Sequence, residues 1–328
     1  MIEALTDWFL REGRALPFRA GHSADGDRPY YVLVSETMAQ QTRMEALVPY
    51  YGRFIARFPD IRTLADAGEA EVLALWAGLG YYSRARNLHK AARAVCERHG
   101  GAVPDSLEAL RALPGVGAYT AGAVASIAFG LPCPAVDGNV RRVYARLFMS
   151  DGGDVSAWAR GLMDQAPPRL VTESLMELGA LICTPSPPKC GRCPVSEHCR
   201  AFSEDRVADF PARRPKPPKR EENRTVCIVR DGEDRVLLRR RTERLLHNMW
   251  EFPVEEQLLA DGFAVRRDPA PLGTASHVFT HIIWRMTAYG ARVTTDKQPE
   301  NYLWAKGLRG LALPSAMRAW ARLLFAGE

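Results

Sequence analysis

Four of the seven cysteines lie close together in one short stretch of the chain. They follow the pattern C-x6-C-x2-C-x5-C in the proline-rich string CTPSPPKCGRCPVSEHC, as Cys183, Cys190, Cys193 and Cys199. Four thiolates in so short a loop can surround one metal centre, either tetrahedral zinc or an iron–sulfur cluster. Structural zinc sites usually pair two C-x2-4-C knuckles, and only one is present here. The spacing therefore predicts a [4Fe–4S] cluster, and plain burial of four loop cysteines is the weaker alternative.

A short glycine turn could bind a second kind of charged group. Residues 113–117 read LPGVG and open directly into the predicted helix AYTAGAVASIAFG. The unpaired N–H groups at such a helix start favour a phosphate, and Gly115 and Gly117 let the backbone approach it. The sequence therefore predicts a phosphate-binding turn, with a simple connection between two helices as the alternative.

An aspartate stands directly before the next predicted helix. Asp137 lies in the string VDGNVRR, where it can also serve as an N-cap. The turn, the aspartate and the four-cysteine loop together resemble the helix-hairpin-helix superfamily of DNA glycosylases, which includes endonuclease III and the MutY-type enzymes. The resemblance implies that the partner is double-stranded DNA and that the four cysteines hold the cluster.

Two further residues indicate the branch of this superfamily. Members that attack damaged pyrimidines carry a lysine two residues after the second hairpin glycine, which forms a Schiff base with the sugar. Tyr119 stands at that position, as in MutY-type adenine glycosylases, and VSETMAQQT resembles the MutY string whose catalytic glutamate maps to Glu36. The resemblance implies a largely monofunctional enzyme that removes adenine mispaired with 8-oxoguanine or guanine.

The two carboxylates suit the removal of a poor leaving group. A protonated Glu36 could donate to N7 of adenine, while an ionised Asp137 stabilises the oxocarbenium ion or traps it covalently. Tyr119, Asn139 and Glu173 match family positions that orient these groups.

An adenine inside a duplex must be flipped out before it can react. Gln41 and Tyr81 match the family's wedge residues, which fill the space that the flipped nucleotide leaves. Thr42 and Leu79 match residues that lie beside the opposing base. Packing of the Tyr81 ring into the core is the alternative.

The second part of the chain resembles the C-terminal domain of MutY proteins, which is related to Nudix hydrolases. The resemblance rests on the strings LLHNMWEFP and HVFTH, and the acidic Nudix box is not present. We therefore expect recognition of 8-oxoguanine rather than pyrophosphate hydrolysis. Phe279, Thr280 and His281 correspond to the family's Phe-Ser-His loop, and burial of one ring in a strand is the alternative.

Three positions depart from the family pattern. Phe18 replaces the tryptophan of Leu-Pro-Trp-Arg, Ala39 stands where a leucine is usual, and Thr280 replaces a serine. The first two affect the expected wall of the adenine pocket, and the third affects the fit to the damaged base.

The elements that must position these residues divide into two domains. Residues 1–203 are mostly helical, with the cluster loop at 183–199, and residues 204–222 form a linker rich in proline and basic residues. Residues 223–328 are expected to form a Nudix-like α+β domain, with strand-like runs at 225–230, 235–240 and 276–289. The fold class is therefore a helix-hairpin-helix glycosylase domain followed by an α+β domain.

Composition limits the remaining possibilities. The formal charge of +6 suits a polyanionic partner, and no apolar run reaches the length of a membrane span. We expect a cytoplasmic, DNA-bound monomer. Three rival functions stay open: a pyrimidine-damage glycosylase, a mismatch glycosylase with another target, and a noncatalytic redox-responsive DNA-binding protein. Tyr119 opposes the first, and the paired carboxylates oppose the last.

Overall fold

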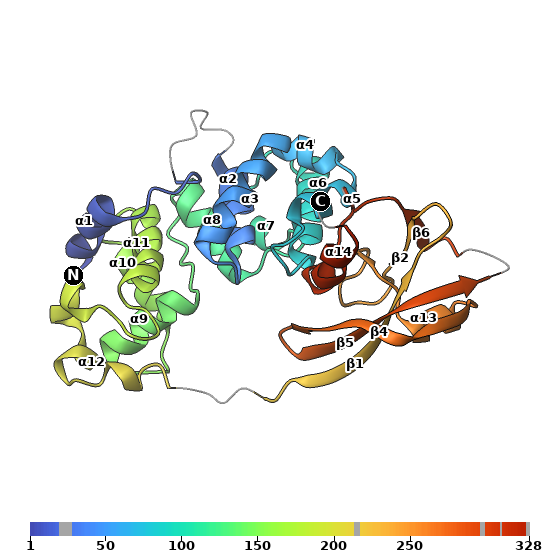
Figure 1. Ribbon diagram of the computed structural model, residues 1–328. Helices are drawn as coiled ribbons and strands as arrows, with labels where there is room; N and C mark the ends of the chain where they lie inside the picture. Colours follow the sequence, from blue (N-terminus) through green and yellow to red (C-terminus); the bar gives the residue numbers. More distant parts are fainter. Residues whose placement is uncertain (20–27, 213–216, 296–298, 309, 326–328) are drawn as a thin grey trace. The chain divides into compact units, whose positions relative to one another are not determined.

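The chain divides into two units (Figure 1). One consists of helices, and the other contains the strands together with a few helices. The computed structural model describes residues 1–19, 28–212, 217–295, 299–308 and 310–325. The first unit, which we call the helical unit, comprises Met1–Ala67 and Ser83–Pro215. The second, the sheet unit, comprises Gly68–Tyr82 and Lys216–Glu328.

The described residues of the helical unit form helices and contain no strand, which confirms the expected α class of this part. Its α-helices are α1 (Ile2–Glu12), α2 (Arg28–Ala39), α3 (Met44–Arg57), α4 (Ile61–Asp66), α6 (Ser83–Arg98), α7 (Leu107–Arg111), α8 (Ala118–Phe129), α9 (Gly138–Phe148), α10 (Val155–Met163), α11 (Pro168–Leu181) and α12 (Arg200–Ser203). Short 3-10 turns are η1 (Cys190–Arg192), η2 (Ser196–His198) and η3 (Val207–Asp209). Within the described ranges, no helix has the length and apolar character needed to cross a membrane.

Close helix packing in this unit depends on small residues. The sequence of α8 is AYTAGAVASIAF, and its middle residues are buried on all sides. A Cβ on Gly122 would lie 2.4 Å from the carbonyl oxygen of Pro134, so a larger residue there would push the neighbouring segment away. Helix α2 packs against α8, and α11 packs against α1, α8 and α9. This packing fixes α2, α8 and α11 relative to one another.

The sheet unit has the α+β composition expected for the second domain. Its elements are α5 (Glu69–Trp76), β1 (Arg220–Val229), β2 (Val236–Arg240), β3 (Trp250–Glu251), α13 (Glu255–Ala260), β4 (Ala264–Val278), β5 (Ile282–Thr294), β6 (Tyr302–Ala305), η4 (Ser315–Met317) and α14 (Arg318–Leu324). One sheet has the strand order β1-β5-β4, with β1 parallel and β4 antiparallel to β5. The other has the order β3-β2-β6 and is antiparallel.

The strand-like run expected at 276–289 is a hairpin rather than one strand. Strand β4 ends at Val278 and β5 begins at Ile282, and the N–H of Phe279 donates to the carbonyl of Ile282 at 2.8 Å. Residues 279–281 therefore form the tip of this hairpin. β-propensity alone could not show the turn, because none of these three residues is glycine or proline.

The linker expected at 204–222 is shorter than predicted. The 3-10 turn η3 lies inside it and β1 already begins at Arg220. Arg146 donates through Nε to the carbonyl of Phe210 at 2.9 Å, and the N–H of Ala212 donates to Asp151. These contacts hold residues 204–212 on the helical unit, and composition could not reveal them. Residues 213–216 of the expected linker lie outside the described residues.

Candidate active site

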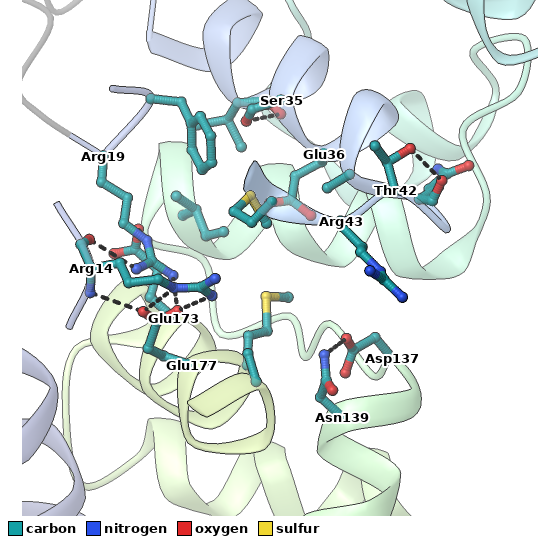
Figure 2. Close-up of a pocket in the computed structure, with 18 of the residues that line it drawn as sticks. Arg14, Arg19, Ser35, Glu36, Thr42, Arg43, Asp137, Asn139, Glu173 and Glu177 are labelled. Atoms are coloured by element: carbon teal, nitrogen blue, oxygen red, sulfur yellow. Dashed lines mark hydrogen bonds and ion pairs between the residues drawn. The ribbon is translucent and has the colours of Figure 1, made fainter. Parts of the chain in front are cut away.

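A cavity of about 570 Å³ opens among α2, α8, α11 and the starts of α3 and α9 (Figure 2). This volume is large enough for a small organic ligand. The cavity gathers the five predicted catalytic residues and two of the predicted DNA-contacting residues. They are Glu36, Tyr119, Asp137, Asn139 and Glu173, and Gln41 and Thr42.

Glu36 is the buried carboxyl group of this cavity. Its side chain projects from α2, only 9% of the residue is exposed, and the Tyr119 hydroxyl donates to its Oε2 at 2.6 Å. Burial raises the pKa of Glu36 to about 7; the charges of Asp137 and Glu173 add to this effect, while the Tyr119 hydrogen bond and Arg19 oppose it. A carboxyl group with this pKa can hold a proton near neutral pH and donate it.

Asp137 faces the same space from the start of α9 (Figure 2). Its Oδ1 caps the helix by accepting the N–H of Val140 at 2.8 Å, and its Oδ2 accepts Nδ2 of Asn139 at 2.8 Å. Asp137 is therefore the N-cap that was expected as an alternative, and it also lines the cavity. Arg142 in turn donates to Oδ1 of Asn139 at 2.8 Å and to the carbonyl of Gly179 at 2.7 Å. This chain of bonds fixes the Asp137 carboxylate.

Close approach of α11 to α9 keeps Asn139 in place. A Cβ on Gly179 would lie 2.4 Å from Cβ of Asn139, so only glycine fits at this contact. The orientation of Asp137 thus depends on a glycine one helix away.

Charged residues that the sequence did not single out complete the cavity wall. Glu173 pairs with Arg169 at 3.0 Å and with Arg19 at 3.6 Å, and Glu177 pairs with Arg14 and Arg19. The sequence did carry a signal for Glu177, because it stands four residues after Glu173 on a predicted helix and so shares its face. Arg14 offered no comparable signal.

Three more lining residues bear on the base pocket. Phe18 and Ala39, two of the three departures from the family pattern, both line the cavity. Arg43 extends between Glu36 and Asp137 and makes no hydrogen bond or ion pair with the other residues drawn in Figure 2.

The glycine turn lies outside this cavity. Gly115 has φ +75°, and a Cβ there would lie 2.4 Å from Cβ of Asn87, so the turn requires glycine at this position. Gly117 is the N-cap of α8. Because glycine has no side chain, no side-chain group at this position accepts a hydrogen bond from the first N–H groups of the helix. These features suit a phosphate, and its binding stays a prediction.

Both predicted wedge residues have a backbone that side chains rarely adopt. Gln41 has φ 56° and Tyr81 has φ 48°, in the left-handed region. Tyr81 is 45% exposed, whereas its neighbour Tyr82 is 4% exposed. The ring that packs into the core is therefore Tyr82, and the Tyr81 ring is presented at the surface. Leu79 lies on the same turn, in the sheet unit.

The hairpin tip of the sheet unit contacts this turn. The hydroxyls of Tyr81 and Thr280 are 3.0 Å apart and hydrogen-bonded. The Phe279 ring packs edge-on against Trp284 with centroids 4.7 Å apart, so the burial expected as an alternative holds in part for this residue. His281 is exposed.

The four cysteines of the loop line one small cavity of the helical unit, apart from the cavity around Glu36. Arg146 donates through Nη1 to Sγ of Cys183 at 3.4 Å. Among the described residues no three His, Cys, Asp or Glu side chains are grouped to hold a metal ion. The four thiols line a common space.

Comparison with known proteins matches two separate stretches of the chain to known families. Residues 34–168 match the HhH-GPD superfamily of base excision DNA repair proteins, and residues 225–322 match the NUDIX domain. The adenine DNA glycosylase of Homo sapiens is 33% identical, over 96% of this chain and 72% of the human protein. That of Mus musculus is 36% identical, over 90% and 70%.

Solved structures resemble the helical part. A thermostable thymine-DNA glycosylase aligns with a TM-score of 0.56 and 27% identity, over 62% of this chain and 95% of that structure. Endonuclease III in a non-covalent complex with DNA aligns with a TM-score of 0.52 and 24% identity, over 62% and 94%, which supports the fold.

Proposed function

Because the chain belongs to the adenine DNA glycosylase family, we propose that it hydrolyses the N-glycosidic bond of adenine mispaired with 8-oxoguanine or guanine in duplex DNA. The family and the base-excision-repair class expected from the sequence are thereby confirmed. The observation that carries the proposed reaction is the placement of Glu36 and Asp137 in one cavity, with a pKa near 7 for Glu36.

Each carboxyl group has a separate role. Protonated Glu36 donates to N7 of the flipped adenine, so that the base leaves as a neutral molecule when its bond to the sugar breaks. Asp137, oriented by Asn139, stabilises the positive charge that develops on the sugar, by charge alone or as a covalent nucleophile. Water then adds at the sugar carbon, and ionised Glu36 accepts its proton. Tyr119 and Glu173 orient Glu36 and set its protonation.

Lyase chemistry is not expected to accompany base removal. No lysine is present among the residues that line the cavity, and Tyr119 occupies the position of the Schiff-base lysine. The abasic sugar therefore stays in an intact strand.

Recognition of the mispair uses the predicted DNA-contacting residues. Gln41 and Tyr81 fill the place of the flipped base, Thr42 and Leu79 contact the opposing base, and Gly115 and Gly117 hold a phosphate. The hairpin tip, Phe279, Thr280 and His281, reads 8-oxoguanine. The hydrogen bond between Tyr81 and Thr280 supports a common task for the wedge and the tip.

A [4Fe–4S] cluster fits the loop of Cys183, Cys190, Cys193 and Cys199. The soft thiolate donors suit it, and all four cysteines line one cavity. When bound, the cluster would fix the loop and offer electron-transfer chemistry. A duplex DNA substrate fits the expected cytoplasmic, DNA-bound protein, which is proposed to act as a monomer.

Single-turnover release of the base tests the proposal. The duplexes carry adenine opposite 8-oxoguanine, adenine opposite guanine, or thymine glycol, each assayed with and without alkali. We expect strand breaks only after alkali, fastest for adenine opposite 8-oxoguanine. Cleavage at thymine glycol without alkali would place the enzyme with the pyrimidine-damage glycosylases instead.

A further inference from the structure

Glu177 holds two arginines at the wall of the catalytic cavity. Its Oε1 accepts the backbone N–H of Arg14 at 2.9 Å and Nε of Arg14 at 2.8 Å. Its Oε2 accepts Nη2 of Arg14 at 2.8 Å and Nη2 of Arg19 at 2.9 Å. The side chain is 1% exposed. Burial opposes its ionisation, but the hydrogen bonds from Arg14 and Arg19 outweigh burial and lower the pKa of Glu177 to about 2.

These bonds attach one segment of chain to α11. Arg14 and Arg19 enclose the string that contains Phe18, and Arg19 also donates to the carbonyl of Arg14 at 3.3 Å. Arg169 of α11 donates to the carbonyl of Arg19 at 3.3 Å. The segment that brings Phe18 to the cavity is therefore fixed from α11 rather than by its own secondary structure.

One of the two arginines held by Glu177, Arg19, also acts on the charge of Glu36. Arg19 lowers the pKa of Glu36, and Glu173 and Asp137 raise it. The carboxylate of Glu177 offsets the Arg14 and Arg19 charges beside the group that must stay protonated.

Other charged or titratable groups also face Glu36 or its helix. Tyr119 on α8 donates to it, Arg43 and Glu45 line the same cavity from the start of α3, and Arg84 on α6 donates to carbonyls at the end of α2. None of these is bonded to Glu177 in the described part of the chain, so a change at Glu177 acts through Arg14 and Arg19.

We propose that Glu177 is a positioning residue for adenine excision, which fixes the segment carrying Phe18 and neutralises Arg14 and Arg19 so that Glu36 keeps its proton. The inference rests on the proposed function. No reacting atom is contacted by Glu177 itself, and its effect passes through Arg19 to Glu36.

The test is the pH dependence of single-turnover adenine release from the duplex with adenine opposite 8-oxoguanine, between about pH 5 and 9. Glu177→Gln keeps the shape of the side chain but removes the negative charge that pairs with Arg14 and Arg19, which lowers the pKa of Glu36. The basic limb of the profile should move to lower pH by roughly half to one unit. Affinity for the same duplex should stay as in the wild type.

Two further variants separate charge from structure. Arg14→Gln removes a cation and leaves Glu177 in excess, so its basic limb should move to higher pH. Glu177→Asp keeps the charge and loses part of the arginine bonds, so its rate should fall while the limb stays in place. A merely structural role would not produce opposite shifts. The Arg14→Gln profile also provides the test if Glu177→Gln fails to fold.

Asp164→Asn is the matched control, because Asp164 forms an exposed pair with Arg160 on α10 and should leave the profile unchanged. The inference is overturned if the wild type excises adenine but the basic limb of the pH profile has the same position in Glu177→Gln and in Arg14→Gln as in the wild type. A wild-type enzyme that releases no adenine would instead overturn the proposed function.

Discussion

Single residues in the cavity differ in protonation because their surroundings differ. Glu36 is buried beside other carboxylates, which raises its pKa to about 7. Asp137 accepts two hydrogen bonds, from Val140 and Asn139, which fix its side chain. Glu177 is held ionised by two arginines. One cavity thus contains a carboxyl group that can hold a proton near neutral pH, Glu36, and one that stays ionised there, Glu177.

The Tyr119 hydroxyl is expected to tune the acid. Its hydrogen bond lowers the pKa of Glu36 against the effect of burial, so Tyr119→Phe should raise that pKa. The basic limb of the excision profile should then move to higher pH by roughly one unit. Single-turnover rates across pH measure the shift. A limb that moves to lower pH would contradict the role given to this hydroxyl.

Sequence reasoning reached the residues whose types are chemically distinctive. Glu36, Asp137, Tyr119, Asn139 and Glu173 were predicted together, and the structure places all five around one cavity. Their catalytic roles stay predictions until they are measured. Arg14 was missed because it is an ordinary surface-type charge in the sequence, and Glu177 was missed although it shares a helix face with Glu173. The bond between them joins residues more than 160 positions apart, which the sequence does not reveal.

At the scale of elements, one close helix contact orients the aspartate. Gly179 of α11 touches Asn139 of α9, and Gly179→Ala would force the two helices apart. We expect a loss of about 1–3 kcal/mol in the free energy of unfolding and slower excision. Urea unfolding and single-turnover assays measure both effects.

Gly161→Ala on α10 is the matched control for this contact. A Cβ there has open space, so the change should be neutral or stabilise the protein by up to about 1 kcal/mol. Equal stability of the two variants would show that the α9–α11 contact tolerates a side chain.

The iron and sulfide that the cysteine loop is expected to bind can be measured directly. Purified wild-type protein should contain about four iron and four sulfide per chain. Cys193→Ser should lower both contents, whereas Cys96→Ser should leave them unchanged, because Cys96 lies outside the loop. Zinc in place of iron, or an unchanged iron content in Cys193→Ser, would contradict the expected cluster.

Helices and strands could be predicted from the sequence where the local pattern of apolar residues agrees with the way the segment packs in the folded protein. The helices of the first part follow their apolar periodicity, and the strand-like runs at 225–230 and 235–240 lie within or next to β1 and β2. The first half of β4 was missed, because its sequence AVRRDPAPLG contains two prolines and a glycine. It pairs with β5 through shifts in register at these residues, so tertiary pairing overrides local preference.

At the scale of the whole molecule, we propose that the helical unit removes the base and that the sheet unit recognises 8-oxoguanine. His281→Ala at the hairpin tip should reduce the preference for adenine opposite 8-oxoguanine over adenine opposite guanine, while both substrates are still processed. The ratio of their single-turnover rates measures it, and His247→Ala, in the same unit but outside the hairpin, is the control. An unchanged ratio would remove His281 from recognition.

The most direct test of the central claim is the rate of adenine release by Glu36→Gln and by the wild type across pH. The wild-type rate should be high below about pH 7 and fall as the pH rises through that value, because the protonated form of Glu36 is the active one. Glu36→Gln should bind the duplex with adenine opposite 8-oxoguanine as tightly as the wild type. Its excision should be slower by about a hundredfold or more at every pH. Undiminished excision by Glu36→Gln would contradict the account.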